Sequence, residues 1–258
     1  MKKILMLILA NDGGKNNIYT TLQNIMRKYI HTNPNIEAYF YKADPNIHDE
    51  YLISGDTIYV KTVDRYPNLW KKFWLVLKAF ENRLDEFSYI SRPNLSTFII
   101  LDRYLKHIET LPKTRCCSGI QFFAKQPIPF PCGYLFTITP DLAKELIYND
   151  VIKDNEGIDD RSIGIVLKHL NIDITKHNNY IEINNTSAQF DSCMNNITNN
   201  ENIFMIRIRN LFHYACSEYP FGIDSENRII EDLKVHNSLL KKFYNINENI
   251  DIDTDIHM

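Results

Sequence analysis

The sequence predicts an α/β fold: a mixed, mainly parallel sheet of Rossmann type, flanked by helices. Short apolar segments typical of buried strands alternate along the chain with longer segments in which apolar residues recur at helical spacing. The first short segment, residues 3–10, is a continuous apolar run, as expected for a strand that is covered on both faces. The chain has 258 residues, of which 44% are hydrophobic and 12% aromatic, which is enough for a large core.

Composition narrows the classes of function. A net charge of −3 lacks the basic excess typical of nucleic-acid binders, so we expect no nucleic-acid partner. No apolar run approaches the ~18 residues that a membrane span requires, and the run at residues 4–10 has no clear signal-peptide cleavage site. The five cysteines form no C-x-x-C pair, which favours reduced thiols in a cytoplasmic protein. Over-use of Asn, Ile, Lys and Tyr indicates an AT-rich genome, such as that of a parasite or a large DNA virus; a viral protein would lie in the host cytoplasm or the virion.

We expect a single domain over residues 1–244, followed by an acidic, flexible tail over residues 245–258. The first strand ends in the turn Asn11-Asp12-Gly13-Gly14, where the first βα loop of a Rossmann-like unit meets a nucleotide. These glycines do not form a G-x-G-x-x-G fingerprint. The next elements are a helix over residues 19–29, strands over residues 35–41 and 58–60, and an aromatic-rich helix over residues 69–84.

Residues 89–98, YISRPNLSTF, run from an apolar strand into a polar turn and back into apolar sequence. In open α/β sheets, ligands bind just beyond the carboxyl end of such a strand. Arg92, Asn94 and Ser96 are the residues of this turn that are able to bind an anion or a polar ligand. An ordinary strand-to-helix loop with Pro93 as its stop signal explains the same residues, so the local sequence leaves both interpretations open.

The second half of the chain continues the alternation. An irregular segment over residues 112–131 is long for a compact domain, which is typical of a functional or mobile loop. Thr139, Pro140 and Asp141 form a helix start, with Thr139 as the N-cap residue. The remaining elements are helices over 98–108, from 159 and over 226–244, strands over 134–138 and 203–208, and a polar, Asn-rich loop over 178–201.

Three segments resemble, in the same order, motifs of the β-1,3-galactosyltransferase family, glycosyltransferase family 31. DRYPNLWKK, residues 64–72, is similar to the family's D-x-Y-x-N-L-T-x-K helix start. The YISRPNLSTF turn takes the place of its K-x-D-D-D-x-F metal motif, with Arg92 on the Lys and Phe98 on the Phe. FPCGYLFTITPDLAKELI, followed by IDDRSIGIVLKHLNI, is similar to its Y-P-x-Y-x-x-G-x-G-Y-x-x-S-x-D block and E-D-V-x-x-G helix start. Uncharacterised proteins of large DNA viruses share an R-x-N-L-S-x-F turn.

The resemblance implies a GT-A fold and an inverting glycosyltransferase, which moves a sugar from a nucleoside-diphosphate sugar, usually a UDP-sugar, to a glycan or protein acceptor. Asp160 falls on the family's catalytic base, and Asp159 on the preceding Glu. A carboxylate at a helix start is held by backbone N–H groups and suits a base, although an N-cap role explains it too. Donor binding is expected of Asn11, Asp12, Tyr66, Lys72, Arg92, Asn94, Ser96 and Arg207, and acceptor binding of Gly133 and Tyr134.

The chain departs from the family where the metal motif has three acidic residues. Asn94 and Ser96 offer neutral oxygens there and Leu95 offers none, although Mn²⁺ and Mg²⁺ prefer charged oxygen ligands. The departure puts a metal at this turn in question. Mn²⁺ and Mg²⁺ remain the cofactors to test, with Asn94 and His213 as candidate ligands.

Two accounts of the departure stay open. In the first, cations replace the metal on the diphosphate of the donor, since guanidinium groups pair well with phosphate oxygens. The candidates for this role are Lys72, Arg92, Arg207 and Arg209. In the second, the chain is a catalytically inactive carbohydrate-binding or interaction protein on a glycosyltransferase scaffold.

Overall fold

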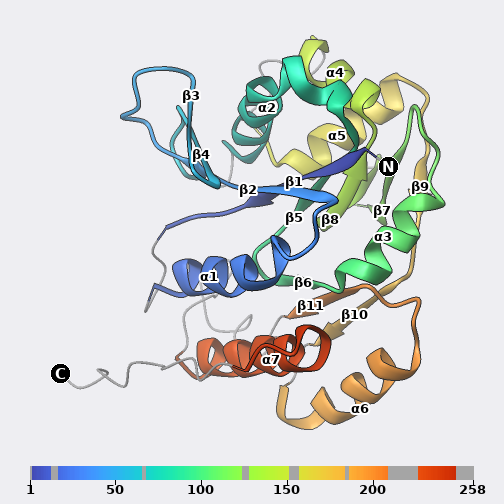
Figure 1. Ribbon diagram of the computed structural model, residues 1–258. Coiled ribbons are helices and arrows are strands. Elements are labelled where there is room, and N and C mark those ends of the chain that lie inside the picture. The colour runs from blue at the N-terminus through green and yellow to red at the C-terminus, as the bar shows by residue number, and fades with distance from the viewer. Residues whose placement is uncertain are drawn as a thin grey trace. The chain divides into compact units, whose positions relative to one another are not determined.

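Figure 1 shows the chain as a computed structural model, which describes residues 2–12, 17–65, 68–123, 128–150, 157–183, 186–208 and 226–247. The chain forms two compact units, each assembled from segments that are distant in the sequence. The first unit takes Met1–Asp12, Ile30–Leu95 and Lys106–Asn178, and the second takes Gly13–Tyr29, Ser96–Leu105 and Asn179–Met258. The single domain expected over residues 1–244 and the flexible tail expected after it remain predictions, and residues 248–258 lie outside the described ones.

The first unit is built on an eight-stranded sheet with the order β3-β4-β2-β1-β5-β8-β7-β9. Its strands are β1 (Lys3–Leu9), β2 (Ile36–Ala43), β3 (Tyr51–Ser54), β4 (Thr57–Val60), β5 (Phe87–Pro93), β7 (Cys117–Phe123), β8 (Pro129–Ile138) and β9 (Ile174–Lys176). Only β3 and β8 pair antiparallel with their neighbours in this sheet; the other pairs are parallel. The α/β fold with a mixed, mainly parallel sheet is therefore confirmed.

Helices pack on one face of this sheet (Figure 1). They are α2 (Leu69–Ala79), the short 3-10 helix η3 (Glu81–Glu86), α4 (Pro140–Tyr148) and α5 (Asp159–His169). α2 contacts both α4 and α5, and its Trp70, Phe73 and Leu77 are buried in a core that also holds Leu5 and Ile90 of the sheet. The 3.6-residue period that predicts the helix at residue 69 is thus the period of its core-facing side.

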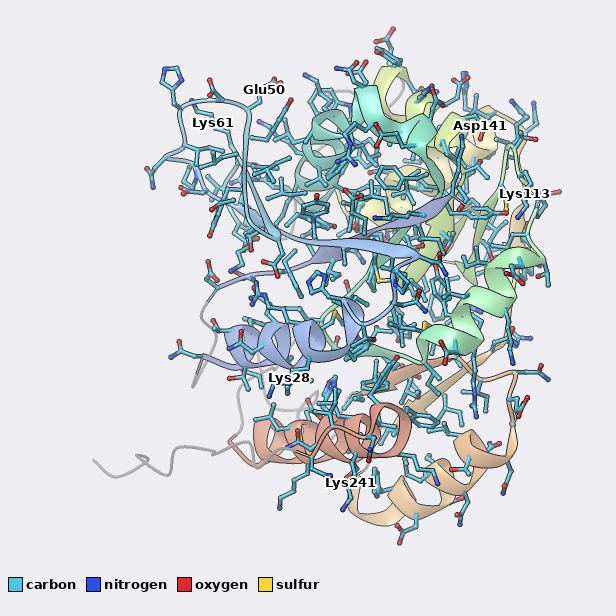
Figure 2. All side chains as sticks on the ribbon, in the orientation of Figure 1. Lys28, Glu50, Lys61, Lys113, Asp141 and Lys241 are labelled. Atoms are coloured by element: carbon cyan, nitrogen blue, oxygen red, sulfur yellow. The ribbon has the colours of Figure 1, made fainter. Side chains whose placement is uncertain are left out.

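β3 and β4 form a hairpin at one edge of the sheet. Its turn uses Gly55 at a φ of +59°, a left-handed conformation that glycine adopts without steric cost. All residues of β3 are exposed. Glu50 and Lys61 lie beside the hairpin (Figure 2), and Glu50 pairs with Lys78 of α2 at 2.8 Å. The apolar side chains of this edge strand therefore face solvent.

The second unit contains a three-stranded sheet with the order β10-β11-β6. Its elements are β6 (Thr97–Ile99), β10 (Tyr180–Ile183), β11 (Met205–Ile208), α1 (Ile18–Ile30), the start of α3 (Leu101–Glu109), α6 (Thr186–Asn199) and α7 (Glu226–Tyr244). The rings of Tyr29, Phe98 and Tyr244 pack together, with centroids 4.7 to 5.8 Å apart. The Tyr244 hydroxyl donates to Ile99 O at 2.7 Å, which fixes the end of α7 to β6.

Several expected boundaries differ from the structure. A strand, β6, precedes α3 where a continuous helix over residues 98–108 is predicted, because residues 97–99 pair with β11. The segment 112–131, predicted to be irregular, contributes β7 and the start of β8. The Asn-rich segment 178–201 is not a loop: it forms β10 and α6, which bury Ile183 and Ile197. The helix predicted over residues 69–84 ends at Ala79 and is followed by η3.

Within the part of the chain that the structure describes, no helix combines the length and the apolar content that a membrane crossing demands.

Candidate active site

The carboxyl ends of β1, β2 and β5 lie side by side. Leu9 forms a parallel bridge with Asn94, and the Ala10 N–H donates to Tyr41 O at 3.1 Å. The exposed residues Asn11 and Asp12 follow directly, and Asp12 pairs with Lys42. The turn after β1 and the turn after β5, which the sequence singles out separately, therefore meet at one edge of the sheet, as the rule for ligand sites in such sheets requires.

A large bulge in β8 reaches towards this edge. Gly119 of β7 pairs with Phe136, and Gln121 pairs with Pro131. Between these two pairs the chain advances by two residues on β7 and by five on β8. The extra residues include Gly133. Bulges of this kind re-aim the chain and occur often beside active sites. This one turns backbone N–H and C=O groups away from the ladder and towards side chains of β5 and α5.

Arg92 is the hub of the site and is only 2% exposed. Its Nε donates to the Tyr41 hydroxyl at 3.2 Å, and its Nη1 donates to Asn94 Oδ1 at 2.7 Å and to Gly133 O at 2.5 Å. Its Nη2 lies 2.5 Å from Asp159 Oδ2. The planar fork of five N–H donors makes arginine suited to hold several acceptors at once. Arg92 thus joins β2, the turn after β5, the bulge and the start of α5.

Asp159 and Asp160 begin α5, and the residue in the N-cap position is Ile158. Asp159 is buried, and its Oδ1 accepts the Asp160 N–H at 3.0 Å. Asp160 is half-buried; its Oδ1 accepts the Arg161 N–H at 2.7 Å and its Oδ2 accepts the Gly133 N–H at 3.2 Å. The N-cap explanation of Asp160 is therefore wrong. Both of its oxygens are oriented by backbone donors, one from α5 and one from the bulge.

The environment of Asp160 weakens its acidity. Burial and then the nearby charge of Asp159 raise the pKa of Asp160 to about 6, although Arg92 acts in the opposite direction. Burial also raises the pKa of Asp159, against the opposing effect of Arg92. A carboxylate with a pKa near neutrality suits general-base catalysis, because it is ionised at neutral pH and still accepts a proton.

Lys72 of α2 lies at the same edge but faces inward. It is 2% exposed, and its Nζ donates to Ala10 O at 2.7 Å and lies 3.2 Å from Asp64 Oδ1. Burial lowers the pKa of Lys72, and Asp64 partly offsets this. Lys72 and Arg92, which the sequence predicts as donor-binding cations, are thus buried and paired. In this conformation they organise the edge and do not offer free charge to a ligand.

The other predicted site residues have the following places in the chain. Ser96 and Arg207 belong to the second unit, where Arg207 Nη1 donates to Ser96 Oγ. Tyr134 follows Gly133 in the bulge, and its carbonyl accepts the Asn94 N–H at 3.0 Å. The expectations for Tyr66, Arg209 and His213 fall outside the residues that the structure describes.

The turn after β5 does not fit a divalent metal ion. Asn94 Oδ1 already accepts from the Arg92 guanidinium, Leu95 is 6% exposed, and Ser96 Oγ accepts from Arg207. An ion at Asn94 Oδ1 would sit against a fixed positive charge, without the anionic oxygens that Mn²⁺ or Mg²⁺ prefers. Across the described ranges, no three His, Cys, Asp or Glu side chains are arranged to hold a metal.

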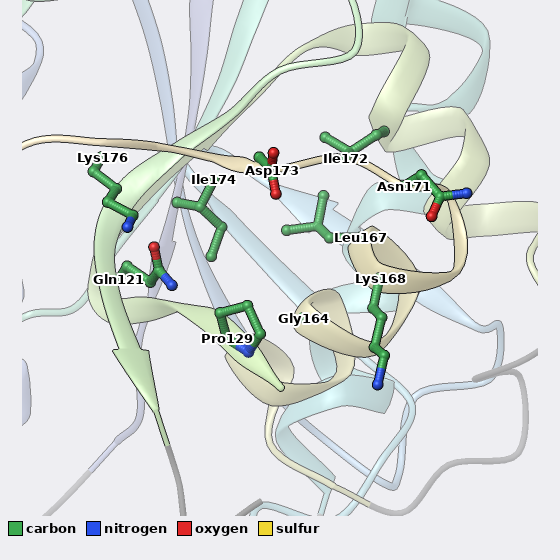
Figure 3. A pocket seen from close by; sticks show the side chains of 10 residues that line it. All are labelled: Gln121, Pro129, Gly164, Leu167, Lys168, Asn171, Ile172, Asp173, Ile174 and Lys176. Carbon is green, nitrogen blue, oxygen red and sulfur yellow. The ribbon is translucent and has the colours of Figure 1, made fainter. Parts of the chain in front are cut away.

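A separate pocket of about 490 Å³ lies at the other end of α5 (Figure 3). Its apolar lining comes from α5, β9 and the start of β8, and the side chains of Lys168, Asp173 and Lys176 stand around it. The pocket contains none of the predicted site residues. Its lining residues are Gln121, Pro129, Gly164, Leu167, Lys168, Asn171, Ile172, Asp173, Ile174 and Lys176.

Sequence reasoning missed Tyr41 and Phe136, which complete the surroundings of Arg92. The Tyr41 hydroxyl accepts from Arg92, and the Phe136 ring lies 5.6 Å beneath the guanidinium carbon. The sequence does hold a signal for Tyr41, because this residue lies at the carboxyl end of the second predicted strand, where ligand sites of such sheets occur. It holds none for Phe136, because the position of this residue beside Arg92 follows from the antiparallel pairing of β5 with β8, two strands that are distant in the sequence.

No protein-family model matches this chain, and no curated protein sequence does. Three solved structures share part of its chain path. A glycosyltransferase involved in glycosylation of the major capsid of PBCV-1 is 10% identical, with coverage of 90% of this chain and 98% of that one and a TM-score of 0.48. The catalytic domain of Drosophila beta1,4-galactosyltransferase 7, in complex with xylobiose, is 11% identical, with coverage of 90% and 79% and a TM-score of 0.43. Francisella tularensis 2-C-methyl-D-erythritol 4-phosphate cytidylyltransferase is 10% identical, with coverage of 67% and 90% and a TM-score of 0.41. Identities and scores this low carry no argument about function.

Proposed function

We propose that the chain is an inverting glycosyltransferase with a GT-A-like fold, which transfers a sugar from a nucleoside-diphosphate sugar, a UDP-sugar in the first instance, to a glycan or protein acceptor. The observation that carries the proposal is Asp160. Its carboxylate stands at the carboxyl edge of the sheet, both oxygens are oriented by backbone N–H groups, and its pKa is raised to about 6. The family resemblance, which covers roughly residues 1–172, implies the role of base for the same residue.

The reaction requires one proton transfer. As the acceptor hydroxyl oxygen forms its bond to the anomeric carbon, Asp160 takes the hydroxyl proton, and the bond from the anomeric carbon to the diphosphate oxygen breaks. Asp159 and Arg92 hold Asp160 in place and do not themselves touch the substrate. The leaving group departs as the nucleoside diphosphate.

Donor binding is proposed for the exposed loop after β1 and for the side chain of Asn94. Asn11 and Asp12 are exposed beside the bridge from Leu9 to Asn94. Because Arg92 holds Asn94 Oδ1, the amide nitrogen of Asn94 is the end that is left to donate to a donor oxygen. Lys72 and Arg92 act indirectly, by fixing Ala10 O and Asn94.

A second candidate function is a catalytically inactive carbohydrate-binding or interaction protein. The burial of Lys72 and Arg92 favours it, because catalysis of this kind needs positive charge on the leaving diphosphate. A cytoplasmic location, in a host cell or a virion for a viral protein, is part of either proposal and remains a prediction.

Two measurements test the proposal. Thermal shift against UDP, GDP and their sugars should show stabilisation by at least one nucleotide, and release of nucleotide from the donor should follow addition of a saccharide acceptor. Asp160→Asn should bind the donor as wild type does and lose turnover, whereas the matched control Asp49→Asn, at an exposed aspartate, should retain it. Wild-type turnover in Asp160→Asn would remove Asp160 from the role of base. Absence of stabilisation by every nucleotide would favour the second function.

A further inference from the structure

The β7–β8 hairpin carries a group of partly exposed aromatic rings beside Asp160. Phe122 pairs with Phe130 across the hairpin, and their ring centroids are 6.5 Å apart. Phe122 also meets Tyr134 of the bulge at 6.1 Å, nearly edge-on. Phe122 is 38% exposed, a large fraction for a side chain with two aromatic neighbours. We call Phe122, Phe130 and Tyr134 the aromatic platform.

The aromatic platform is connected to Asp160 at two points. Tyr134 directly follows Gly133, whose N–H holds Asp160 Oδ2 at 3.2 Å. Arg161 directly follows Asp160, and its guanidinium lies 5.9 Å over the Phe130 ring. Arg161 is exposed, so its N–H donors face solvent at the border between the rings and the carboxylate. The aromatic platform therefore borders the carboxylate that we propose as the base.

We propose that the aromatic platform, together with Arg161, is the subsite that binds a pyranose ring of the acceptor. The inference rests on the proposed function, since that function makes Asp160 the place where the acceptor hydroxyl arrives. The flat apolar face of a sugar ring packs on aromatic side chains, and its edge hydroxyls need a few well-placed donors. The rings supply the first requirement and Arg161 supplies the second.

The size and charge of the surface favour a sugar over other occupants. Three rings form a patch far smaller than the ~800 Å² per partner of a stable protein interface. The patch stands beside the Asp159 and Asp160 carboxyls, and the chain has a net charge of −3, both of which disfavour a nucleic acid. A sugar ring is small enough for this patch and carries no negative charge, so neither the area nor the charge of the surface disfavours it.

Saturation-transfer NMR with the methyl glycosides of glucose, galactose, mannose, xylose and N-acetylglucosamine tests the subsite directly. At least one of them should bind to wild type. Phe122→Ala and Phe122→Leu should weaken that binding by about fivefold, and Phe122→Tyr, which keeps a ring, should restore it. The matched control is Phe123→Ala: Phe123 is the next residue, is more exposed at 65%, and pairs with Pro129, which lines the pocket in Figure 3.

In the binding experiment, any of three outcomes would overturn the subsite: no glycoside binds, Phe122→Leu binds as wild type does, or Phe123→Ala weakens binding as much as Phe122→Ala. Sedimentation of the same variants shows whether Phe122 instead holds a second copy of the chain, which also overturns it. Thermal shift with UDP on wild type and Phe122→Ala separates this test from the proposed function. Glycoside binding that depends on Phe122 without any nucleotide binding or transfer would refute the transferase and keep the subsite. Sugar transfer that is unaffected in Phe122→Leu would refute the subsite and support the transferase.

Discussion

Arg92 Nη2 lies 2.5 Å from Asp159 Oδ2, and the two side chains are 2% and 3% exposed. Such a pair is costly to bury and costly to break, because removing one partner leaves the other as an unpaired buried charge. Asp159 in turn accepts the N–H of Asp160. The ion pair therefore sets the position of the carboxylate that we propose as the base.

Arg92→Met should lower the free energy of unfolding by about 3–5 kcal/mol, because it leaves the Asp159 carboxylate buried without its counter-charge. Urea denaturation followed by circular dichroism measures the loss. The double variant Arg92→Met/Asp159→Asn, which removes both charges, should be less destabilised than the sum of the two single variants. Strict additivity of the single losses would show that the two side chains do not depend on each other.

The rate of transfer should rise as the pH increases from about 5 to about 7, because Asp160 acts only when ionised. Burial and the charge of Asp159 raise the pKa of Asp160 to about 6, and the apparent pKa of the rate should fall near that value. The pH profile of nucleotide release measures it. An apparent pKa near that of an ordinary aspartate, or the same profile in Asp160→Asn, contradicts the assignment.

The free energy of unfolding should depend on the same carboxyl group, but it should fall as the pH rises. Asp160 holds its proton more tightly in the folded state, at a pKa of about 6, than in the unfolded chain, at ~3.9. Its contribution to stability is therefore fully present below pH ~4 and is lost as the pH rises through about 6. Between these pH values, the free energy of unfolding of Asp160→Asn should gain about 1–3 kcal/mol relative to wild type. A pH-independent difference between the two proteins would contradict the raised pKa.

Gly133→Ala should impair turnover more than stability. A Cβ at this position would lie 3.1 Å from Asp160 Oδ2 and 3.2 Å from Arg92 Nη1, and both atoms are side-chain ends that move at the expense of their alignment. Gly164→Ala is the matched comparison, because its Cβ would lie 2.6 Å from the backbone oxygen of Pro129. That clash opposes the packing of α5 on β8, so Gly164→Ala should mainly lower the melting temperature. Equal effects of the two variants on turnover at matched stability would contradict the assignment.

Donor binding should persist in excess EDTA. Asn94 Oδ1 accepts a hydrogen bond from Arg92, and Ser96 Oγ accepts one from Arg207. Guanidinium groups therefore already contact the side-chain oxygens that would otherwise bind a metal ion. Isothermal titration of UDP, with EDTA and with added Mn²⁺, measures the effect. Binding that disappears in EDTA and returns with Mn²⁺ would reveal a metal site that involves residues other than those of this turn.

The alternation of apolar segments was sufficient to predict the α/β fold, because strand and helix periods differ and buried strands are short. The final helix, 226–244, and the start of α5 at Asp159 were predicted at their observed bounds. β6, β10 and α6 were not, because they are specified by partners distant in the sequence: Phe98 pairs with Ile206, and the Asn-rich α6 is anchored by a buried Ile197. Local sequence favours a helix from residue 98 and a loop over residues 178–201 until the tertiary contacts are counted.

For the site, four of the residues that the sequence singled out lie together, but the sequence did not show which side chains are buried. Arg92, Asn94, Gly133 and Asp160 do lie together, through direct hydrogen bonds. Arg92 and Lys72 are buried against Asp159, Tyr41 and the backbone of Ala10, and direct contact of either cation with the donor stays a prediction. Charge is visible in a sequence, whereas its neutralisation by a residue tens of positions away is not.

The exposed edge strand β3 bears on how this protein behaves when concentrated. Among the described strands, β3 is the last on its side of the sheet, and its Tyr51, Leu52 and Ile53 are 38–52% exposed. An outer strand with apolar side chains invites another extended chain to add to it, which is a route to aggregation. Leu52→Lys, which places a gatekeeper charge there, should raise solubility at high concentration without altering the distant turnover site.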